Sequence, residues 1–361
     1  MKRVLVAPLN WGLGHATRCV PLIEKISALG AEVVLAGYGA VYDFFLKRFP
    51  DYPLILLPDH IVSYQARGRQ LMLPVIKGLP GYALSLYREH QALHPIIKKY
   101  SIGFVVSDNR YGMWHPEVPS VLITHQINIR VNGLWKAGTP LLRTITQWFF
   151  SHFQEIWIPD FPSWPGLAGQ LSHPQKPSPH FRYIGPLSRF KQPAPVAENP
   201  TYDFLALLSG PEPQRTILEN IFIRIFLNGP GKTILLRGIP GNGDIIQKSP
   251  YLTLVPHLSD DELFQLIRQS RQIICRSGYS SLMDLYVLQR GAVLVPTPGQ
   301  PEQEYLARLH NQQPGFRVFT QQEIEVLGPE DLIASSNETR STYPDNSSAL
   351  EDACHSILLY L

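Results

Sequence analysis

The sequence has 361 residues, of which 44% are hydrophobic, and its 32 Lys and Arg nearly balance its 29 Asp and Glu at a net charge of +3. This balance argues against a nucleic-acid binder, and no apolar stretch reaches the roughly 18 residues needed to span a bilayer. The three cysteines form no CxxC pair, so we expect neither a disulfide framework nor a metal site. We expect the protein in a reducing, cytoplasmic setting.

The first part of the chain alternates short apolar runs with longer amphipathic stretches. The runs are apolar almost throughout, which is typical of parallel strands covered on both faces. A helix at 16–30 follows the first run and ends at Gly30, a residue favoured at helix C-termini. We predict strands at 3–9, 31–38, 53–58, 102–108, 120–126 and 155–160.

The middle of the chain is rich in proline, which cannot sustain helices. One more strand is predicted at 181–187, and 191–200 reads as a linker. The alternation then restarts. We predict strands at 202–210, 232–238, 251–258, 272–278 and 291–297, and helices at 214–229, 259–269, 279–289, 302–312 and 347–361.

The predicted fold is α/β, with two doubly wound Rossmann-like domains whose parallel sheets face each other across a ligand cleft. We assign 1–190 to an N-terminal Rossmann-like domain, 201–345 to a C-terminal Rossmann-like domain and 346–361 to a C-terminal helix.

The stretch NWGLGH, residues 10–15, lies where the first strand turns into a helix. It resembles a dinucleotide fingerprint only in part, because Thr17 replaces the third glycine and no acidic residue follows the second strand. A tight turn with a structural histidine is one interpretation. The other makes His15 a general base at the mouth of a glycine loop.

A second candidate base is Asp108, at the carboxyl end of the strand 102–108, where it could instead cap a turn. We rank His15 above it. The residues expected on the acceptor side are Asn10, Gly12, Arg18, Asn109 and His125.

The stretch 272–284 ends a strand and opens a helix with small residues, which lets backbone amides approach a diphosphate. Asp284 lies about one turn further on, where it could accept from ribose hydroxyls. Gln303 and Glu304 open the next helix and could hold sugar hydroxyls; helix capping and surface polarity are the plainer interpretations. The donor-binding candidates are Gly14, Ser209, Gly210, Arg215, Arg276, Ser277, Gly278, Tyr279, Ser280, Ser281, Asp284, Gln303 and Glu304.

Three segments, NWGLGHATR, SDDELFQLIRQSRQIICRSGYSSLMDL and PTPGQPEQEYLA, resemble the MurG-like group of GT-B glycosyltransferases, glycosyltransferase family 28. The resemblance implies a nucleotide-sugar donor on the C-terminal domain, with Asp284 in place of the family's ribose-binding glutamate. Glu304 replaces the second of two sugar-contacting glutamines. The family's phosphate loop is reduced to Ser209-Gly210-Pro211, where proline lacks an amide donor.

The resemblance implies an inverting, metal-independent transfer of a hexose or N-acetylhexosamine from a nucleoside diphosphate sugar, with UDP expected, to a lipid-linked or glycan acceptor. No cofactor is expected, and no nucleic acid partner. Two alternatives stay open: a nucleotide-sugar 2-epimerase and a non-catalytic nucleotide-sugar-binding protein.

An amphipathic stretch at 139–153 carries Trp148, Phe149, Phe150 and Phe153. It either packs into the core or touches the inner face of the plasma membrane as a peripheral contact. We expect a monomer or a weak dimer.

Overall fold

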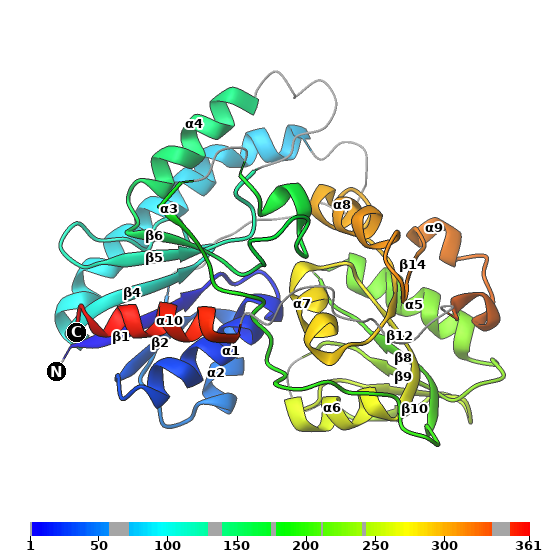
Figure 1. The fold of residues 1–361 in the computed structure, drawn as a ribbon. Helices are drawn as coiled ribbons and strands as arrows, with labels where there is room; N and C mark the ends of the chain where they lie inside the picture. Colours follow the sequence, from blue (N-terminus) through cyan, green and yellow to red (C-terminus); the bar gives the residue numbers. More distant parts are fainter. Residues whose placement is uncertain are drawn as a thin grey trace. The chain divides into compact units, whose positions relative to one another are not determined.

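The computed structural model describes residues 2–57, 72–128, 139–174, 178–210, 212–239, 243–333 and 347–361. These residues form two compact units, each built around a seven-stranded sheet (Figure 1). One unit contains the described residues up to Leu187 together with the C-terminal helix, and the other contains those from Ser188 to Ile333. The predicted α/β class with two doubly wound sheets is confirmed.

The sheet of the first unit is parallel throughout, in the order β3-β2-β1-β4-β5-β6-β7. Its central strands are fully buried, which explains why they are apolar on both faces. The strands are β1 (Arg3–Pro8), β2 (Val33–Gly37), β3 (Leu54–Leu56), β4 (Ile102–Asp108), β5 (Ser120–Ile123), β6 (Glu155–Ile158) and β7 (Phe181–Tyr183).

The helices of this unit are α1 (Leu13–Ala28), α2 (Gly39–Arg48), α3 (Met72–Tyr100), α4 (Thr139–Phe150), the short 3-10 turn η2 (Gly169–Leu171) and α10 (Ser347–Leu358). Helix α1 ends before Gly30, whose φ of 86° lies in the left-handed region that glycine favours. Helix α10 packs against α1, where Lys25 pairs with Glu351 at 2.9 Å (Figure 1). The C-terminal helix is therefore part of the first unit.

The sheet of the second unit has the order β10-β11-β9-β8-β12-β13-β14, and its β10–β11 pair is antiparallel. The strands are β8 (Tyr202–Leu207), β9 (Thr233–Leu236), β10 (Ile246–Gln247), β11 (Leu252–Val255), β12 (Ser270–Cys275), β13 (Ala292–Leu294) and β14 (Phe316–Val318). The helices are α5 (Gln214–Phe226), α6 (Asp260–Arg268), α7 (Tyr279–Leu288), α8 (Pro301–His310), α9 (Gln321–Ile324) and the 3-10 turn η3 (Pro329–Leu332).

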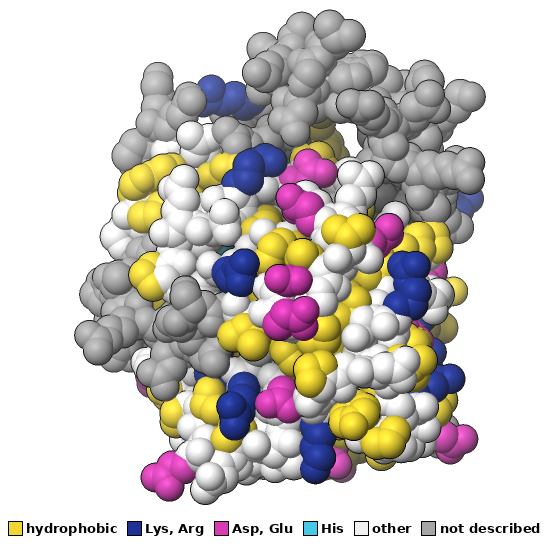
Figure 2. All heavy atoms as spheres, turned by 90° about the vertical axis from the view of Figure 1, so that its right-hand side faces the viewer, with side chains coloured by type: hydrophobic (Ala, Val, Ile, Leu, Met, Phe, Trp, Pro, Cys, Tyr) yellow, Lys and Arg dark blue, Asp and Glu magenta, His cyan; other side chains and the backbone are white. Residues whose placement is uncertain are grey.

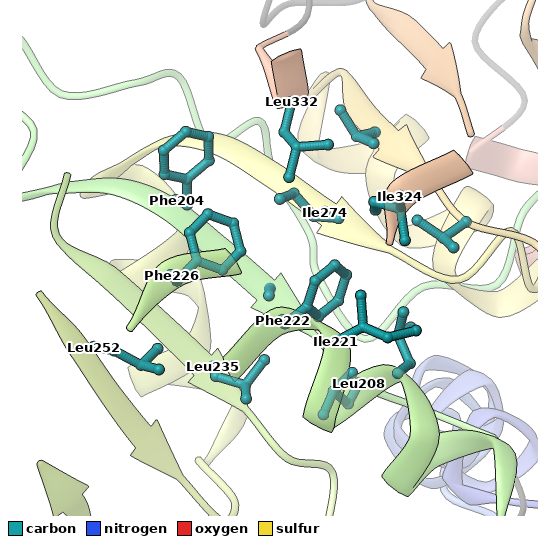
Figure 3. Close-up of a cluster of buried hydrophobic side chains, with 14 of the residues drawn as sticks. Phe204, Leu208, Ile221, Phe222, Phe226, Leu235, Leu252, Ile274, Ile324 and Leu332 are labelled. Atoms are coloured by element: carbon teal, nitrogen blue, oxygen red, sulfur yellow. The ribbon is translucent and has the colours of Figure 1, made fainter. Parts of the chain in front are cut away.

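Local sequence explains where these helices start. Ser259 accepts from the backbone N–H of Glu262, and the Glu262 carboxylate accepts from the N–H of Ser259, which forms a complete capping box at the start of α6. Helix α5 lays Phe222 and Phe226 on the sheet, and the turns at α9 and η3 close the same cluster (Figure 3). The labelled side chains are Phe204, Leu208, Ile221, Phe222, Phe226, Leu235, Leu252, Ile274, Ile324 and Leu332.

The segment 191–200, which we predicted to be a linker, is irregular and belongs to the second unit. Ala194 is fully buried. Its N–H donates to the Leu288 carbonyl at 2.9 Å, and its carbonyl accepts from Arg290 at 3.3 Å. The change of unit lies just upstream, between Leu187 and Ser188.

The face of the molecule in Figure 2 shows acidic and basic side chains interspersed among apolar ones. Within the described part of the chain, no helix is both long and apolar enough to cross a bilayer.

The core of the second unit yields a stability prediction. Phe222→Ala should lower the free energy of unfolding by about 3–5 kcal/mol, because it opens a cavity among fully buried side chains. Ile217→Ala on the same helix, at a side chain with 36% exposure, should cost less than about 1 kcal/mol. Urea unfolding followed by circular dichroism measures both, and equal costs would contradict the packing described.

Candidate active site

Both sheets have a point where the strand order reverses, and ligands of doubly wound folds bind outside the carboxyl ends of the strands at this switch point. In the first unit the reversal lies between β1 and β4, and in the second between β8 and β12. The turn holding His15 follows β1, and Asp108 ends β4. Ser209 and Gly210 follow β8, while Ser277 and Gly278 follow β12. The predicted residues therefore gather at two switch points.

The turn after β1 depends on its glycines. Gly12 is the N-cap of α1 at φ 76°, a conformation that costs other residues energy, although a Cβ would meet nothing within 4 Å. The helix that follows places His15, Arg18 and Cys19 three and four residues apart, on one face.

This face is directed at Asp108, whose carboxylate is fully buried. Arg18 donates to Oδ2 from Nε at 2.8 Å and to Oδ1 from Nη2. The Nδ1 atom of His15 lies 3.1 Å from Oδ2, and the Cys19 Sγ lies 3.7 Å from the same oxygen. The two candidate bases are therefore one hydrogen-bonded pair, with Arg18 as a third member.

The charges of this group set its protonation. Burial raises the pKa of Asp108, but the charges of Arg18 and His15 and the hydrogen bonds from both outweigh it, so the pKa lies well below its usual range. Burial and the Arg18 charge lower the pKa of His15, while Asp108 opposes them. Because an ionised Asp108 can only accept, His15 donates its Nδ1 proton and keeps a lone pair on Nε2.

The other residues predicted for the acceptor side lie around this group. Asn109 follows β4 with φ 55°, and its N–H donates to the Ile123 carbonyl at 3.1 Å. His125 is buried after β5 and lies close enough for its charge to lower the pKa of His15. The Asn10 side chain packs against Gly39 at the start of α2. Arg18 is buried against Asp108, which makes it a positioning residue.

In the second unit, α7 begins after Gly278, a residue with no side chain to cover the first turn. Ser280 and Ser281 are partly buried in that turn, and Tyr279 packs into the core. The positive end of the helix thus lies at the switch point, where an anion is stabilised. The Ser277 hydroxyl donates to the Gln303 carbonyl at 2.8 Å, so it braces α7 against α8.

Arg276 was predicted either to stabilise the donor diphosphate or to be a structural ion-pair partner; its guanidinium is fully buried and turned into the fold. It donates to the carbonyls of Val295, Pro296 and Gln214 and to the side chain of Gln321. Burial lowers its pKa to about 10. It therefore acts as a clamp on the loops around the switch point.

Gln303 and Glu304 support the loop in front of α8. The Gln303 Oε1 accepts from the N–H of Thr297 at 2.9 Å, and the Glu304 Oε1 accepts from the N–H of Gly299 at 3.0 Å. The Gln303 Nε2 lies beside Gly278. Asp284 is held by Ser188 and Arg189, two residues that the sequence motifs did not identify.

The loop after β8 leads into a cluster of charges. Ser209 and Gly210 are exposed, with Gly210 at φ 97°; Pro211 lies outside the described residues.

Arg215 pairs with Glu212 and Glu219 at 2.5 Å each, and Arg237 pairs with Glu219 at 2.8 Å. Burial lowers the pKa of Arg215, and the two glutamates raise it by more. No sequence motif identified Arg237 as a residue of this cluster.

Comparisons with known proteins agree with this arrangement. Residues 259–352 match the model of the glycosyltransferase family 28 C-terminal domain. An uncharacterized glycosyltransferase of Methanopyrus kandleri is 21% identical over 297 residues, 78% of this chain and 81% of the relative. MurG of Acinetobacter baumannii superposes with a TM-score of 0.52 at 14% identity, over 92% of this chain and 89% of that one. UGT89C1 of Arabidopsis thaliana, complexed with UDP-L-rhamnose, gives 0.56 at 12% identity, over 99% and 94%.

The two sheets and these likenesses show that the chain has the GT-B fold of those glycosyltransferases. In sequence, residues 259–352 are similar to the glycosyltransferase family 28 C-terminal domain. The resemblance that the sequence motifs indicated is confirmed at this level.

The His15–Asp108 pair yields a titration prediction. His15 should titrate below 6.5, and Asp108→Asn should lower its pKa further, because the carboxylate is what opposes burial and Arg18. Titration of ¹³C-labelled histidines by NMR measures this, with the exposed His355 as a reference that should not move. A His15 pKa above 6.5, or an upward shift in the variant, would contradict the assigned geometry.

Proposed function

We propose that this protein is an inverting, metal-independent glycosyltransferase that moves a hexose or N-acetylhexosamine from a UDP-sugar to a lipid-linked or glycan acceptor. The observation that carries the proposal is the His15–Asp108 pair at the switch point of the first sheet. UDP is favoured because UGT89C1, which shares the fold, is complexed with UDP-L-rhamnose.

In this reaction the Nε2 of His15 accepts the proton of an acceptor hydroxyl as that oxygen attacks the anomeric carbon. The bond from the anomeric carbon to the diphosphate oxygen breaks, and the configuration inverts. Asp108 stabilises the imidazolium that forms and fixes the tautomer that leaves Nε2 available.

The leaving diphosphate gains negative charge as its bond to the sugar breaks. We propose that it lies at the start of α7, where helix amides and the helix dipole stabilise it. Arg215 in the first turn of α5 and Arg237 after β9 are candidates for added positive charge, and each pairs with Glu219. The Oε1 atoms of Gln303 and Glu304 bind the loop in front of α8, so we propose that the Gln303 Nε2 and Glu304 Oε2 atoms contact the sugar.

The function is tested in two steps. A thermal-shift screen of nucleoside diphosphate sugars identifies the donor, and NMR then follows its turnover with acceptor extracts. His15→Ala should slow transfer by about 10²–10⁴-fold while the affinity for UDP stays unchanged, because His15 belongs to the first unit. His355→Ala, at an exposed position on α10, is the matched control.

Near-normal transfer by His15→Ala would remove the base assignment. Conversion of the donor to an epimer without acceptor would select the 2-epimerase, and tight binding with no turnover would select a binding protein. Failure of any nucleoside diphosphate to bind in isothermal titration would overturn the donor site itself.

We further propose that α4 contacts a membrane surface, as a lipid-linked acceptor would require. Phe150 and Phe153 are buried in a cluster with Leu122 and Ile156, which fits core packing. On the opposite side of the helix, Ile145 and Trp148 lie three residues apart and are 43% and 57% exposed. Tryptophan favours the bilayer interface, and the nearby Arg143 is also exposed.

Sedimentation with anionic liposomes tests this contact. Ile145→Ser/Trp148→Ser should weaken binding by about tenfold or more, because two large apolar side chains no longer insert. Val326→Ser, at an 85% exposed valine of the second unit, should change nothing. Wild-type protein that stays in the supernatant would contradict the proposal.

A further inference from the structure

The carboxylate of Asp284, in the second turn of α7, is contacted by Ser188 and Arg189, the first two described residues of the second unit. The Ser188 hydroxyl donates to Oδ1 at 2.6 Å. The Arg189 Nε lies 3.4 Å from Oδ2. Both residues precede β8 by more than ten positions and belong to none of the motifs that mark the donor site.

The Ser188 hydroxyl has a fixed direction. It accepts from the N–H of Phe190 at 3.1 Å, and its one proton is donated to Asp284. Ser188 is buried, so water does not compete for this bond. The contact therefore orients the carboxylate as well as stabilising its charge.

Arg189 lies between two carboxylates. Its Nη1 is 3.1 Å from the Asp260 Oδ1 at the start of α6, while its Nε faces Asp284. The guanidinium lies over the Phe190 ring at 5.1 Å, and that ring packs on Phe264 of α6 at 6.2 Å. The Arg189 guanidinium thus contacts Asp260, Asp284 and the Phe190 ring, so its position depends on α6 as well as on α7.

The contacts with Ser188 and Arg189 affect the pKa of Asp284. Burial raises the pKa of Asp284 above its usual value, and Asp260 adds to this rise; Arg189 and Ser188 reduce the rise without reversing it. Without the two positioning residues, a carboxyl in this place would be protonated more readily and could rotate. With them it is a fixed acceptor.

We propose that Ser188 and Arg189 are positioning residues that present Asp284, ionised and in one orientation, to the ribose hydroxyls of the donor nucleotide. An ionised carboxylate has about four lone-pair sites. Ser188 occupies one of them through a hydrogen bond, and Arg189 faces Oδ2 as an ion-pair partner at 3.4 Å, which leaves lone pairs for a pair of vicinal hydroxyls. The inference rests on the proposed donor site and adds the two residues that position its ribose-facing carboxylate.

Isothermal titration of the full chain with UDP and with 2′,3′-dideoxy-UDP tests the inference, because the two nucleotides differ only in the ribose hydroxyls. Wild-type protein should prefer UDP by about tenfold or more, as expected for hydrogen bonds to a charged acceptor. Ser188→Ala and Arg189→Met should each remove most of this preference. Their affinity for dideoxy-UDP should stay within about twofold of the wild type, since the base and diphosphate contacts are untouched.

Matched variants separate positioning from loss of fold. Ser188→Thr keeps the hydroxyl and should keep the preference. Arg189→Lys keeps the charge without the fork that reaches both carboxylates, and should give an intermediate value. Asp261→Asn alters an exposed carboxylate on the same turn of α6 and should behave as wild type.

Two results would overturn the inference: equal affinity of the wild type for both nucleotides, or an undiminished preference in folded Ser188→Ala and Arg189→Met proteins. A wild type that binds neither nucleotide would instead overturn the proposed function.

Discussion

The carboxylate of Asp108 has no exposed surface, and the geometry of the first unit's site depends on how it is compensated. A buried charge is stable only when it is paired and hydrogen-bonded. Arg18 supplies the charge and two donors, and His15 supplies a third. The same contacts fix the imidazole, so the stability of the carboxylate and the chemistry of the histidine have one cause. Replacing Arg18 would leave the buried carboxylate unpaired, at a cost of about 3–5 kcal/mol.

The second unit also has a switch point that is supported by buried polar contacts. A parallel sheet with a reversal in strand order leaves its neighbouring carboxyl ends open to a ligand. There, Arg276 binds the carbonyls of the surrounding loops, and Ser188 with Arg189 orients Asp284. In both units a buried arginine stabilises the switch point from within the protein. The atoms that we propose to face the ligands come from helix starts and from His15, Asp284, Gln303 and Glu304.

Much of this could be predicted from the sequence. Apolar runs of strand length, separated by amphipathic stretches, predicted the α/β fold, and the capping box at Ser259 fixed the start of α6. The helices α2 and α9 and the strand β14 are too short or too weakly periodic to stand out. The role of α10 was also hidden, since its packing on α1 is a long-range contact.

The sites were predictable as residue types but not as partners. His15 and Asp108 are 93 positions apart, and only the adjacency of β1 and β4 joins them. Arg18 and Cys19 could have been assigned to the same face as His15 from helical spacing alone. Ser188 and Arg189 could not, because no local pattern links them to Asp284, and nothing in the motif showed that Arg276 turns inward.

The proposed chemistry requires a neutral His15 whose proton lies on Nδ1, toward Asp108. The ¹⁵N chemical shifts of the His15 ring at pH 7 test it most directly. We expect a protonated Nδ1 and an unprotonated Nε2. A ring protonated on Nε2, or on both nitrogens, would contradict it.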